Sequence, residues 1–558
     1  MNASFFGAAL VAASLVTSWT AAADPLSITD DMLLNAAKEP NNWITYGRDY
    51  SNTRFSPLRQ IDSNNAKRLT AQWSFSFGVL EGQTTTPLVN NGVMYVTSSW
   101  SKVFALDAKT GEMLWRYDHP LAEDVAKYAC CDVVNRGVAM YHDKVYLATL
   151  DMHVVALDAK SGKVVWDKTL ADYKDAYTFT VAPLVARGKV YVGTSNGEYP
   201  IRGFIEALDA GSGNSVWRTY TVPTPGEPGN DTWGGESWKY GGGSAWVTGA
   251  YDPQNNTLYW GTGNPAPDWD GDARPGDNLY TNSTLALDPD TGKIKFHFQY
   301  TPHDMWDYDG VNEQILTTVR GKKAWIHADR NGYFYAIDRS NGKFIYGKPI
   351  SKVNWATLDP NGRPVVDPSK VPTRTKAASD VCPGPNGGKE WNPMAMNPHT
   401  GIVYMPLRDV CVTNLMSLQQ EPVRGEPFWG VKTIDFQRGF GRILAMNAET
   451  GDTVWEVKMR SPVMSGMLVT AGDVVFAGSP EGEFMAFNAK NGDALWKHRV
   501  GSGIVGGPIT YSVDGKQYVA VPSGFGGWVG WATIGQGGAP HLKDLPKGGS
   551  LHVFALPN

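Results

Sequence analysis

ALDAKTGEMLW, residues 105–115, is the most informative segment of the sequence for the fold, because the same pattern returns six more times along the chain. In all seven copies an Asp or Asn is followed four residues later by Gly and eight residues later by Trp, Phe or Tyr. The other copies are ALDAKSGKVVW (156–166), ALDAGSGNSVW (207–217), ALDPDTGKIKF (286–296), AIDRSNGKFIY (336–346), AMNAETGDTVW (445–455) and AFNAKNGDALW (486–496). A strand, a glycine turn and a second strand with an aromatic residue at a fixed position make a β-hairpin.

The first three copies follow one another at intervals of about 50 residues, and further short strands with turn signals precede several of them. Units of about four short strands that repeat at this interval are typical of the blades of a β-propeller. We expect each repeated aromatic side chain to pack between neighbouring blades. A sandwich of unrelated hairpins is the alternative, and seven copies of one spacing argue against it.

The two ends of the chain supply the blade that the seven copies lack. SLHVFALPN (550–558) matches the strand before the turn, and LTAQWSFSFG (69–78) resembles the missing outer strand. Pairing them would close the ring and hide its edges. The predicted fold class is therefore all-β: a single eight-bladed β-propeller over residues 24–558, closed by N- and C-terminal strands.

Residues 1–23 have the pattern of a secretory signal peptide. An apolar run at 5–16 leads to Ala21, Ala22 and Ala23, which predicts cleavage after Ala23. The run is short for a membrane anchor, and no later segment approaches 18 apolar residues, so no membrane span is expected. A net charge of −5 without any Lys/Arg-rich run argues against nucleic acid as a partner. We expect an exported protein in an oxidising compartment.

The segment YACCDVVNRG (128–137) places Cys130 and Cys131 side by side. Adjacent Cα atoms lie about 3.8 Å apart, whereas ordinary disulfides prefer about 4.4–6.8 Å, so a bond between these neighbours would close a strained ring. Strain of this kind is kept at functional sites. Two unbonded thiols are the alternative that the dipeptide alone leaves open.

Glu198, Asn264, Asp307 and Asp309 stand outside the repeat and offer oxygen atoms. Such donors suit a hard cation, and the sequence shows no His/Cys cluster with the spacing of a zinc site. In an extended segment Asp307 and Asp309 would point to the same side and could share one ion. A solvated acidic loop is the alternative explanation.

With these features on one chain, the sequence resembles the pyrroloquinoline quinone (PQQ)-dependent alcohol dehydrogenases, which include the methanol dehydrogenase large subunit and ethanol-oxidising relatives. The resemblance covers essentially the whole mature chain. It is carried by the vicinal cysteines, GTGNPAP (261–267), TPHDMWDYDG (301–310), HADRNG (327–332) and GFGGW (524–528) among the Trp repeats.

The resemblance implies a quinone held between a Cys130–Cys131 disulfide and the ring of Trp246. It implies polar cofactor contacts from Glu81, Arg136, Thr180, Ser195, Asn196, Gly197, Ser244 and Arg330. The implied metal ligands are Glu198, Asn264 and Asp307, and Asp307 is also the implied catalytic base. Trp528 and Trp269 are candidates for the substrate pocket or for packing, and Cys382–Cys411 matches a second disulfide of the family.

Asp309 decides which branch of the family the chain is similar to. Calcium-dependent members usually carry a small or neutral residue at this position, and members with Asp there resemble the lanthanide-dependent branch. One more carboxylate suits a trivalent ion, so we expect a lanthanide(III) ion, with Ca²⁺ as the alternative. Glu390, beside Lys389, and Met464 depart from the family pattern and argue against a strict methanol enzyme.

The implied activity is oxidation of a primary alcohol to an aldehyde by hydride transfer to PQQ, with the metal as Lewis acid and Asp307 as base. No CxxCH haem motif occurs, so a periplasmic cytochrome c is the implied electron acceptor. A homodimer is left open. The alternatives are a noncatalytic periplasmic propeller scaffold and a quinoprotein sugar or polyol dehydrogenase.

Overall fold

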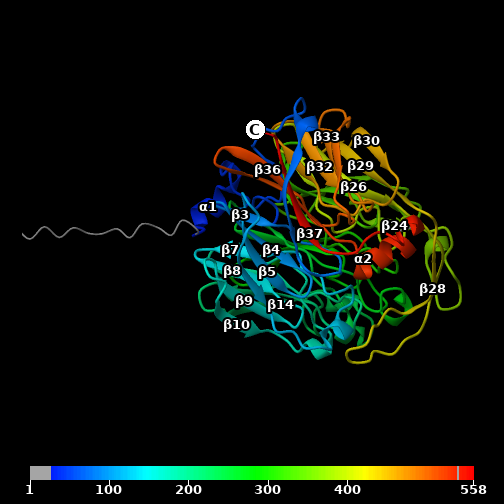
Figure 1. The fold of residues 1–558 in the computed structure, drawn as a ribbon. Helices are drawn as coiled ribbons and strands as arrows, with labels where there is room; N and C mark the ends of the chain where they lie inside the picture. Colours follow the sequence, from blue (N-terminus) through cyan, green and yellow to red (C-terminus); the bar gives the residue numbers. More distant parts are fainter. Residues whose placement is uncertain (1–26, 537–538, 558) are drawn as a thin grey trace, which may run out of the picture.

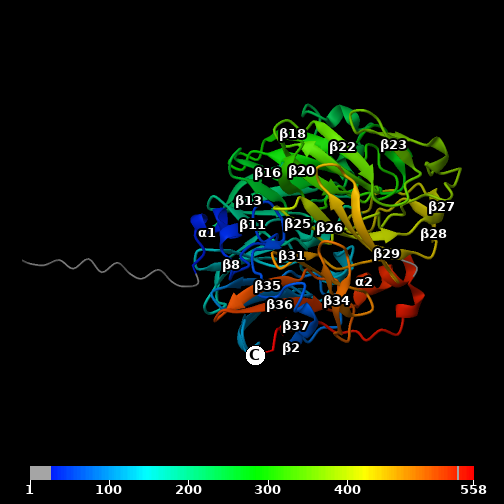
Figure 2. The same cartoon turned by 90° about the horizontal axis from the view of Figure 1, so that it is seen from above.

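In the computed structural model, eight sheets stand around a common centre as the blades of a propeller, and their strands are antiparallel except for one short strand (Figures 1 and 2). The structure describes residues 27–536 and 539–557, so the predicted signal peptide, residues 1–23, lies outside the described residues. Among the described helices, none combines the length and the apolar composition that crossing a bilayer requires.

Seven blades are built from consecutive parts of the chain, and each runs from a buried inner strand to a more exposed outer strand. The first blade contains β3 (Leu88–Asn90), β4 (Val93–Ser98), β5 (Lys102–Asp107) and β6 (Met113–Asp118), and the second contains β7 (Ala139–Tyr141), β8 (Lys144–Ala148), β9 (His153–Asp158) and β10 (Val164–Thr169). The third contains β11 (Leu184–Ala186), β12 (Lys189–Gly193), β13 (Phe204–Asp209) and β14 (Ser215–Tyr220), and the fourth contains β15 (Ala250–Asp252), β16 (Thr257–Gly261), β17 (Ser283–Leu287) and β18 (Ile294–Gln299). The next three are β19 (Ile315–Val319), β20 (Lys322–Ala328), β21 (Tyr333–Asp338) and β22 (Phe344–Pro349); β25 (Ala395–Asn397), β26 (Ile402–Asp409), β29 (Phe440–Asn447) and β30 (Thr453–Met459); and β31 (Leu468–Thr470), β32 (Val474–Gly478), β33 (Glu483–Asn488) and β34 (Ala494–Arg499), to which β1 (Phe55–Ser56) adds a parallel inner strand.

The eighth blade joins the two ends of the chain, as the sequence predicts. Strands β35 (Ile509–Val513), β36 (Lys516–Ser523) and β37 (Ser550–Ala555) come from the C-terminal part. The outer strand β2 (Thr70–Ser76) comes from the N-terminal part and pairs antiparallel with β37, with Thr70 opposite Ala555. The prediction of an eight-bladed propeller is confirmed.

The repeated aromatic residues pack between neighbouring blades, and most of them also hydrogen-bond there. Four indole N–H groups donate to the carbonyl directly after the Asp or Asn of the next copy. These bonds are Trp115 to Ala159 (3.0 Å), Trp166 to Ala210 (3.2 Å), Trp217 to Pro289 (3.1 Å) and Trp455 to Ala489 (2.9 Å). The same sequence pattern therefore produces the same contact between neighbouring blades at several positions around the ring.

The repeated glycine has two physical reasons. Gly162 adopts a φ of +70°, which favours glycine, and a Cβ atom there would lie 2.6 Å from the ring of Trp115 in the preceding blade. Gly111, in the first copy, meets Trp73 of the eighth blade in the same way, at 2.5 Å. The contact that joins consecutive blades therefore also closes the ring.

Two hairpins that the repeat does not predict stand apart from the blades: β23 (Ala356–Leu358) with β24 (Pro364–Val366), and β27 (Val412–Ser417) with β28 (Val431–Phe436). The short helices are α1 (Asp30–Leu34), α2 (Gly527–Trp531), the π-helix η9 (Ala532–Gln536) and the 3₁₀ helices η1 (Ala36–Lys38), η2 (Ala66–Arg68), η3 (Val125–Tyr128), η4 (Tyr173–Asp175), η5 (Asn230–Thr232), η6 (Ser237–Tyr240), η7 (Gly271–Ala273), η8 (Pro368–Lys370) and η10 (Pro540–Leu542). Figure 1 shows α2 and β28 on the same side of the ring.

Candidate active site

The predicted site residues meet at one end of the ring because of where they stand relative to the strands. Arg136 precedes the inner strand β7, whereas Ser195 and Glu198 follow the second strand β12, and Arg330 follows the second strand β20. In an antiparallel blade the beginning of the first strand and the end of the second lie at the same edge. Residues more than 190 positions apart therefore reach one common centre.

Two adjoining cavities lie at this end and share Cys130, Cys131, Glu198, Arg330 and Trp528. The first is also lined by Thr84, Asp132, Val134, Arg136, Thr180, Ser195, Asn196, Trp246, Glu390, Trp391 and Val529. The second is also lined by Asp268, Trp269, Asp307, Pro385, Asn386, Trp429, Val431 and Ile434. Glu81, Gly197, Ser244, Asn264 and Asp309 are not among the residues that line either cavity.

The structure joins Cys130 to Cys131 and Cys382 to Cys411, so both predicted disulfides are present. Asn196 holds the Cys130 segment in place. Its side-chain oxygen accepts from the Cys130 N–H (3.1 Å), and its side-chain nitrogen donates to the carbonyls of Tyr128 (2.6 Å) and Ala176 (2.7 Å). Although Asn196 lines the cavity, its amide is used to position the disulfide.

Asp132 connects the disulfide segment to Trp528. The Trp528 backbone N–H donates to Asp132 Oδ2 at 3.1 Å, and a Cβ atom at Gly527 would lie 1.6 Å from the same oxygen. Only glycine at position 527 permits this approach, which explains one glycine of the GFGGW motif. The contact fixes Trp528 against both cavities.

A buried arginine stands between two indole rings in the first cavity. The Arg136 Cζ atom lies 4.4 Å from the ring centroid of Trp246 and 4.5 Å from that of Trp391. Its Nη1 donates to Thr180 Oγ1 (2.6 Å), which contacts Ser195 Oγ (2.7 Å). Burial lowers the pKa of Arg136 to about 10, so it is a fixed cation at neutral pH. Trp391 was not predicted, although it follows Glu390.

Three carboxylates surround the guanidinium of Arg330. Its Nη1 lies 3.0 Å from Asp307 Oδ1, its Nη2 lies 3.2 Å from Asp309 Oδ2, and Nη2 also pairs with Glu390. Burial alone would lower the pKa of Arg330, but these carboxylates hold it above its usual range. Glu390, which departs from the family pattern, therefore has a structural partner here.

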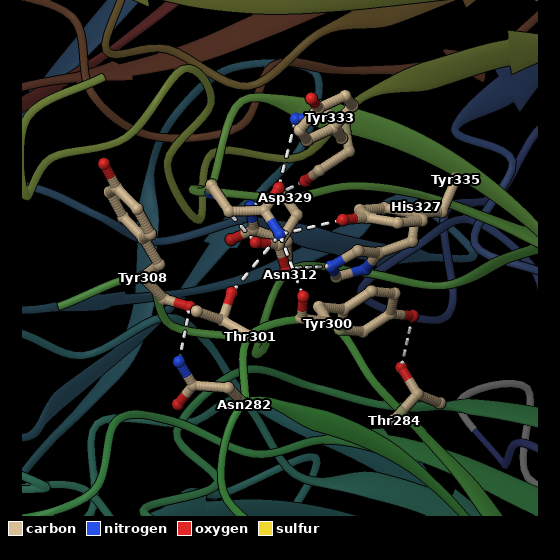
Figure 3. Close-up of polar contacts among 12 residues, drawn as sticks. Asn282, Thr284, Tyr300, Thr301, Tyr308, Asn312, His327, Asp329, Tyr333 and Tyr335 are labelled. Atoms are coloured by element: carbon tan, nitrogen blue, oxygen red, sulfur yellow. Dashed lines mark hydrogen bonds and ion pairs between the residues drawn. The ribbon is translucent and has the colours of Figure 1, made fainter. Parts of the chain in front are cut away.

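Asp307 and Asp309 converge, but for a different reason from the one that the sequence suggested. The segment is not extended: Asp307 has a φ of +61°, and the next strand begins only at Ile315. Asp304 shapes the bend by accepting from the backbone N–H groups of Trp306 (2.9 Å) and Tyr308 (2.8 Å). Figure 3 shows Asn282, which donates to the Tyr308 carbonyl at 2.9 Å. Local hydrogen bonds, and not strand alternation, bring the two carboxylates together.

The side-chain nitrogen of Asn264 is hydrogen-bonded to Asp268, so the side-chain oxygen of Asn264 points away from Asp268. Its Nδ2 donates to Asp268 Oδ1 (2.8 Å), and its backbone N–H donates to Asp309 Oδ1 (2.7 Å). Within residues 27–536 and 539–557, Asn264 Oδ1, Asp268 Oδ2 and Ser244 Oγ are buried and have no hydrogen-bond partner. A Cβ atom at Gly197 would lie 2.5 Å from Asn264 Oδ1, so glycine keeps this space open. Buried polar atoms of this kind call for a partner that the protein does not supply.

The carboxylates repel one another. Burial, with Asp309 adding to it, raises the pKa of Glu198 to about 7. Burial also raises the pKa of Asp307 and Asp268 well above the usual range, and other carboxylates of the cluster add to both shifts. A bound cation would relieve this repulsion, and the donors are all oxygen atoms, so the residues fit a hard cation.

Asp268 was missed from the sequence. The same run, PAPDWDGD, contains the predicted Trp269, but no local pattern separates Asp268 from the neighbouring acidic residues. Trp429, Val431 and Ile434 of the second cavity were also missed, because they belong to the segment of hairpin β27–β28, which lies outside the repeat.

Comparison with known proteins agrees with this geometry. Residues 43–363 and 431–519 match the family model "PQQ: Glucose/ethanol/alcohol dehydrogenase, beta-propeller domain". The chain is 42% identical to quinoprotein alcohol dehydrogenase PedH of Pseudomonas putida, over 98% of this chain and 97% of the relative. It is 40% identical to the lanthanide-dependent methanol dehydrogenase of Methylacidiphilum fumariolicum, over 95% of both chains. The solved structure of a europium-containing methanol dehydrogenase superimposes with a TM-score of 0.90 at 40% identity, over 94% of this chain and all of the other.

Proposed function

The chain belongs to the PQQ-dependent alcohol dehydrogenases, and on that premise we propose that it oxidises a primary alcohol to an aldehyde with PQQ and a lanthanide(III) ion. The observation that carries this proposal is the arrangement around Arg330. Glu198, Asp307 and Asp309 converge beside a cavity that is lined by the Cys130–Cys131 disulfide and Trp246. When bound, the quinone supplies the acceptor for a hydride and the cation supplies a Lewis acid.

The residues that would hold the cation are Glu198, Asn264, Asp307 and Asp309, which offer hard oxygen ligands. Those that would surround the quinone are Cys130, Cys131, Arg136, Thr180, Ser195, Trp246 and Arg330, with Gly197 and Ser244 shaping the site and Glu81 outside the two cavities. Arginine forms paired bonds with carboxylates, which suits a tricarboxylate cofactor. Asn196 would act through the disulfide segment that it holds.

Asp307 is the proposed base for the hydroxyl proton of the alcohol. It lines the second cavity together with Trp269, Trp429 and Trp528, so a small alcohol there would reach its carboxylate. The contact from Arg330 to Oδ1 fixes the orientation of the carboxylate. The three indole rings would exclude water and limit the size of the alcohol.

The choice of metal follows from charge. Glu198, Asp307 and Asp309 carry three negative charges when ionised, and a trivalent ion balances them whereas Ca²⁺ does not. Two similar proteins have names that specify a lanthanide or europium. Asp309 is therefore proposed to select the lanthanide.

Electrons are proposed to leave to a periplasmic cytochrome c, because the sequence contains no CxxCH motif for a haem of its own. Two apolar side chains are well exposed: Trp429 (44%), which lines the second cavity, and Leu80 (64%), whose backbone carbonyl lies against Gly526 of the GFGGW motif. They offer an apolar contact near the cofactor cavity for a redox partner. The periplasm is the proposed location, in agreement with the two disulfides.

The test is reconstitution of metal-free protein with PQQ and either La³⁺ or Ca²⁺, with dye-linked oxidation of a series of primary alcohols and of glucose. We expect turnover with La³⁺ and primary alcohols, and at least tenfold less with Ca²⁺. Asp309→Ala should lose the preference for La³⁺, whereas Asp435→Ala, which removes an exposed carboxylate on β28, should keep it. Activity with Ca²⁺ alone would refute the role of Asp309, and protein that binds no PQQ would refute the whole proposal.

A further inference from the structure

A second cluster of metal-ligating side chains lies away from the active site, between the first two blades. His119 follows β6, Asp151 lies in the turn between β8 and β9, and His153 begins β9. One ligand atom from each residue lies within 4.8 Å of the other two. The exposed fractions of these side chains are 2% for His119, 11% for Asp151 and 26% for His153, so the cluster is largely buried but has one open side.

The outer nitrogens of both imidazole rings have partners of their own. His153 Nδ1 lies 2.7 Å from the carboxylate of Asp167, and His119 Nδ1 lies 3.1 Å from the hydroxyl of Tyr117. These partners leave both Nε2 atoms on the side of Asp151, where His119 Nε2 contacts the Asp151 carboxylate. His153 Nε2 also contacts the Thr169 hydroxyl at 3.0 Å, a contact that a bound metal would replace. Metal-binding histidines in proteins are oriented in this way, with the nitrogen that does not bind the metal held by a carboxylate or another polar group.

The spacing of the inner atoms suits one small cation. His119 Nε2 lies 3.0 Å from the Asp151 carboxylate, and His153 Nε2 lies 3.9 Å from it. In a tetrahedral zinc site with bonds of about 2.0–2.1 Å, neighbouring ligand atoms lie about 3.3 Å apart, which is between these two distances. Small side-chain rotations would equalise them.

An open cleft provides room for a fourth ligand. Asp151, His153 and Thr169 line a cleft of about 470 Å³, together with residues 170–173. Three protein ligands and one position open to water are the arrangement of an accessible zinc site. The cluster also differs in chemistry from the carboxylate site, because two of its three ligands are nitrogen, which lanthanides and Ca²⁺ disfavour.

We propose that His119, Asp151 and His153 bind a divalent transition metal of the zinc class, as a second metal site independent of the proposed activity. His119 opens the segment 119–136, which carries the Cys130–Cys131 disulfide and ends at Arg136. A metal bound here ties the beginning of that segment to the turn between β8 and β9. The site therefore anchors the loop that carries the disulfide.

The experiment uses the purified full-length protein, loaded with its active-site cofactors, and titrates it with ZnCl₂ by calorimetry. We expect one equivalent of zinc beyond the active-site metal, with LaCl₃ unable to displace it. CoCl₂ in place of zinc should give visible absorption bands of a four-coordinate site. At a hundredfold excess of zinc over its Kd, the Tm should rise by about 2 °C.

Three variants test the assignment. His119→Asn and His153→Asn should each weaken zinc binding at least tenfold, and His142→Asn, an exposed histidine in the turn between β7 and β8, should leave binding unchanged. If His119→Asn does not fold, the more exposed His153 still provides the test. No binding at 100-fold molar excess of ZnCl₂, or binding that both cluster variants retain, would overturn the proposal.

Discussion

The contacts between blades and the active site differ in whether their buried polar atoms have hydrogen-bond partners within the protein. Between blades, Trp217 donates its indole N–H to the Pro289 carbonyl at 3.1 Å, and its ring packs where a Cβ atom at Gly292 would lie. In the active site, Asn264 Oδ1 and Asp268 Oδ2 are buried without a hydrogen-bond partner among the described residues. The contact at Trp217 is complete as folded, whereas the active site is completed by a ligand.

The contacts between blades therefore contribute to stability, whereas the active site is arranged for ligand binding. Burying a charge without a full set of partners costs on the order of several kcal/mol. The repeated packing of aromatic side chains on glycine turns offsets such a cost, because each buried aromatic ring contributes on the order of 2 kcal/mol or more. The ring can therefore hold the carboxylates close together before a cation arrives.

The largest effect on activity is expected for Asp307→Asn, which changes the active site and leaves the contacts between blades intact. Loss of a general base lowers the rate by about 10²–10⁴-fold. The Tm of the metal-free protein should stay equal or rise, because the substitution removes a charge from the crowded cluster. The Tm is measured on the metal-free protein, and turnover is measured after the same preparation is loaded with PQQ and metal and both contents are checked. Undiminished turnover would remove Asp307 from the role of base.

Trp217→Ala should lower the stability of the protein and leave its active site intact, which is the reverse of the result expected for Asp307→Asn. Truncation of a buried aromatic side chain costs about 3–5 kcal/mol of unfolding free energy, measured by urea denaturation. Trp217→Phe keeps most of the packing and loses only the bond to Pro289, so it should cost about 1 kcal/mol. Neither change should alter the metal content of the folded protein. A Trp217→Ala protein as stable as the wild type would show that the blade contacts do not support the ring.

Asp268→Ala tests the residue that accepts the hydrogen bond from the side-chain amide of Asn264. Without Asp268, the Asn264 amide loses the partner that orients its oxygen. Removal of such a partner weakens metal binding by about 10–100-fold. Metal affinity is measured by competition with a chelator. Asp268→Asn, which keeps an oxygen atom to accept the bond, should restore most of the affinity if the effect is positional.

The smallest effect, taken per pH unit, is a pH dependence of stability at His327. Burial, with a contribution from Lys389, lowers the pKa of His327 to about 3, and the ring stacks on Tyr300 and contacts Asp329 (Figure 3). The unfolded chain binds a proton there below a pH of about 6.5, whereas the folded chain does so only below about 3. Stability should therefore fall between these values as the pH decreases, by up to about 1.4 kcal/mol per pH unit.

His327→Gln should remove that part of the pH dependence. The measurement is the unfolding free energy at several pH values between 6.5 and 4 for both proteins. The wild type should show the steeper decrease on acidification. Equal slopes would mean that His327 is not held neutral in the folded protein.

Much of the fold could be predicted from the sequence, because its signal is local and repeated. The spacing from Asp107 to Gly111 and Trp115 sets a hairpin, and seven copies of it define a ring that needs one more blade. The pairing of β2 with β37 followed from the same pattern. The candidate site was predicted less completely. Cys130 and Cys131 stood out as neighbours, whereas Asp268 and Trp391 had no local pattern that set them apart.

Spacing along the chain was sufficient to predict the blades and the closure of the ring, and the resemblance to a known family implied both disulfide pairs. No sequence pattern indicated that Asn196 holds the disulfide segment, that Asp268 orients Asn264 or that Asp307 reaches Arg330 through a left-handed bend. Each of these roles depends on the direction of a hydrogen bond, and that direction is set when distant segments pack at one end of the ring.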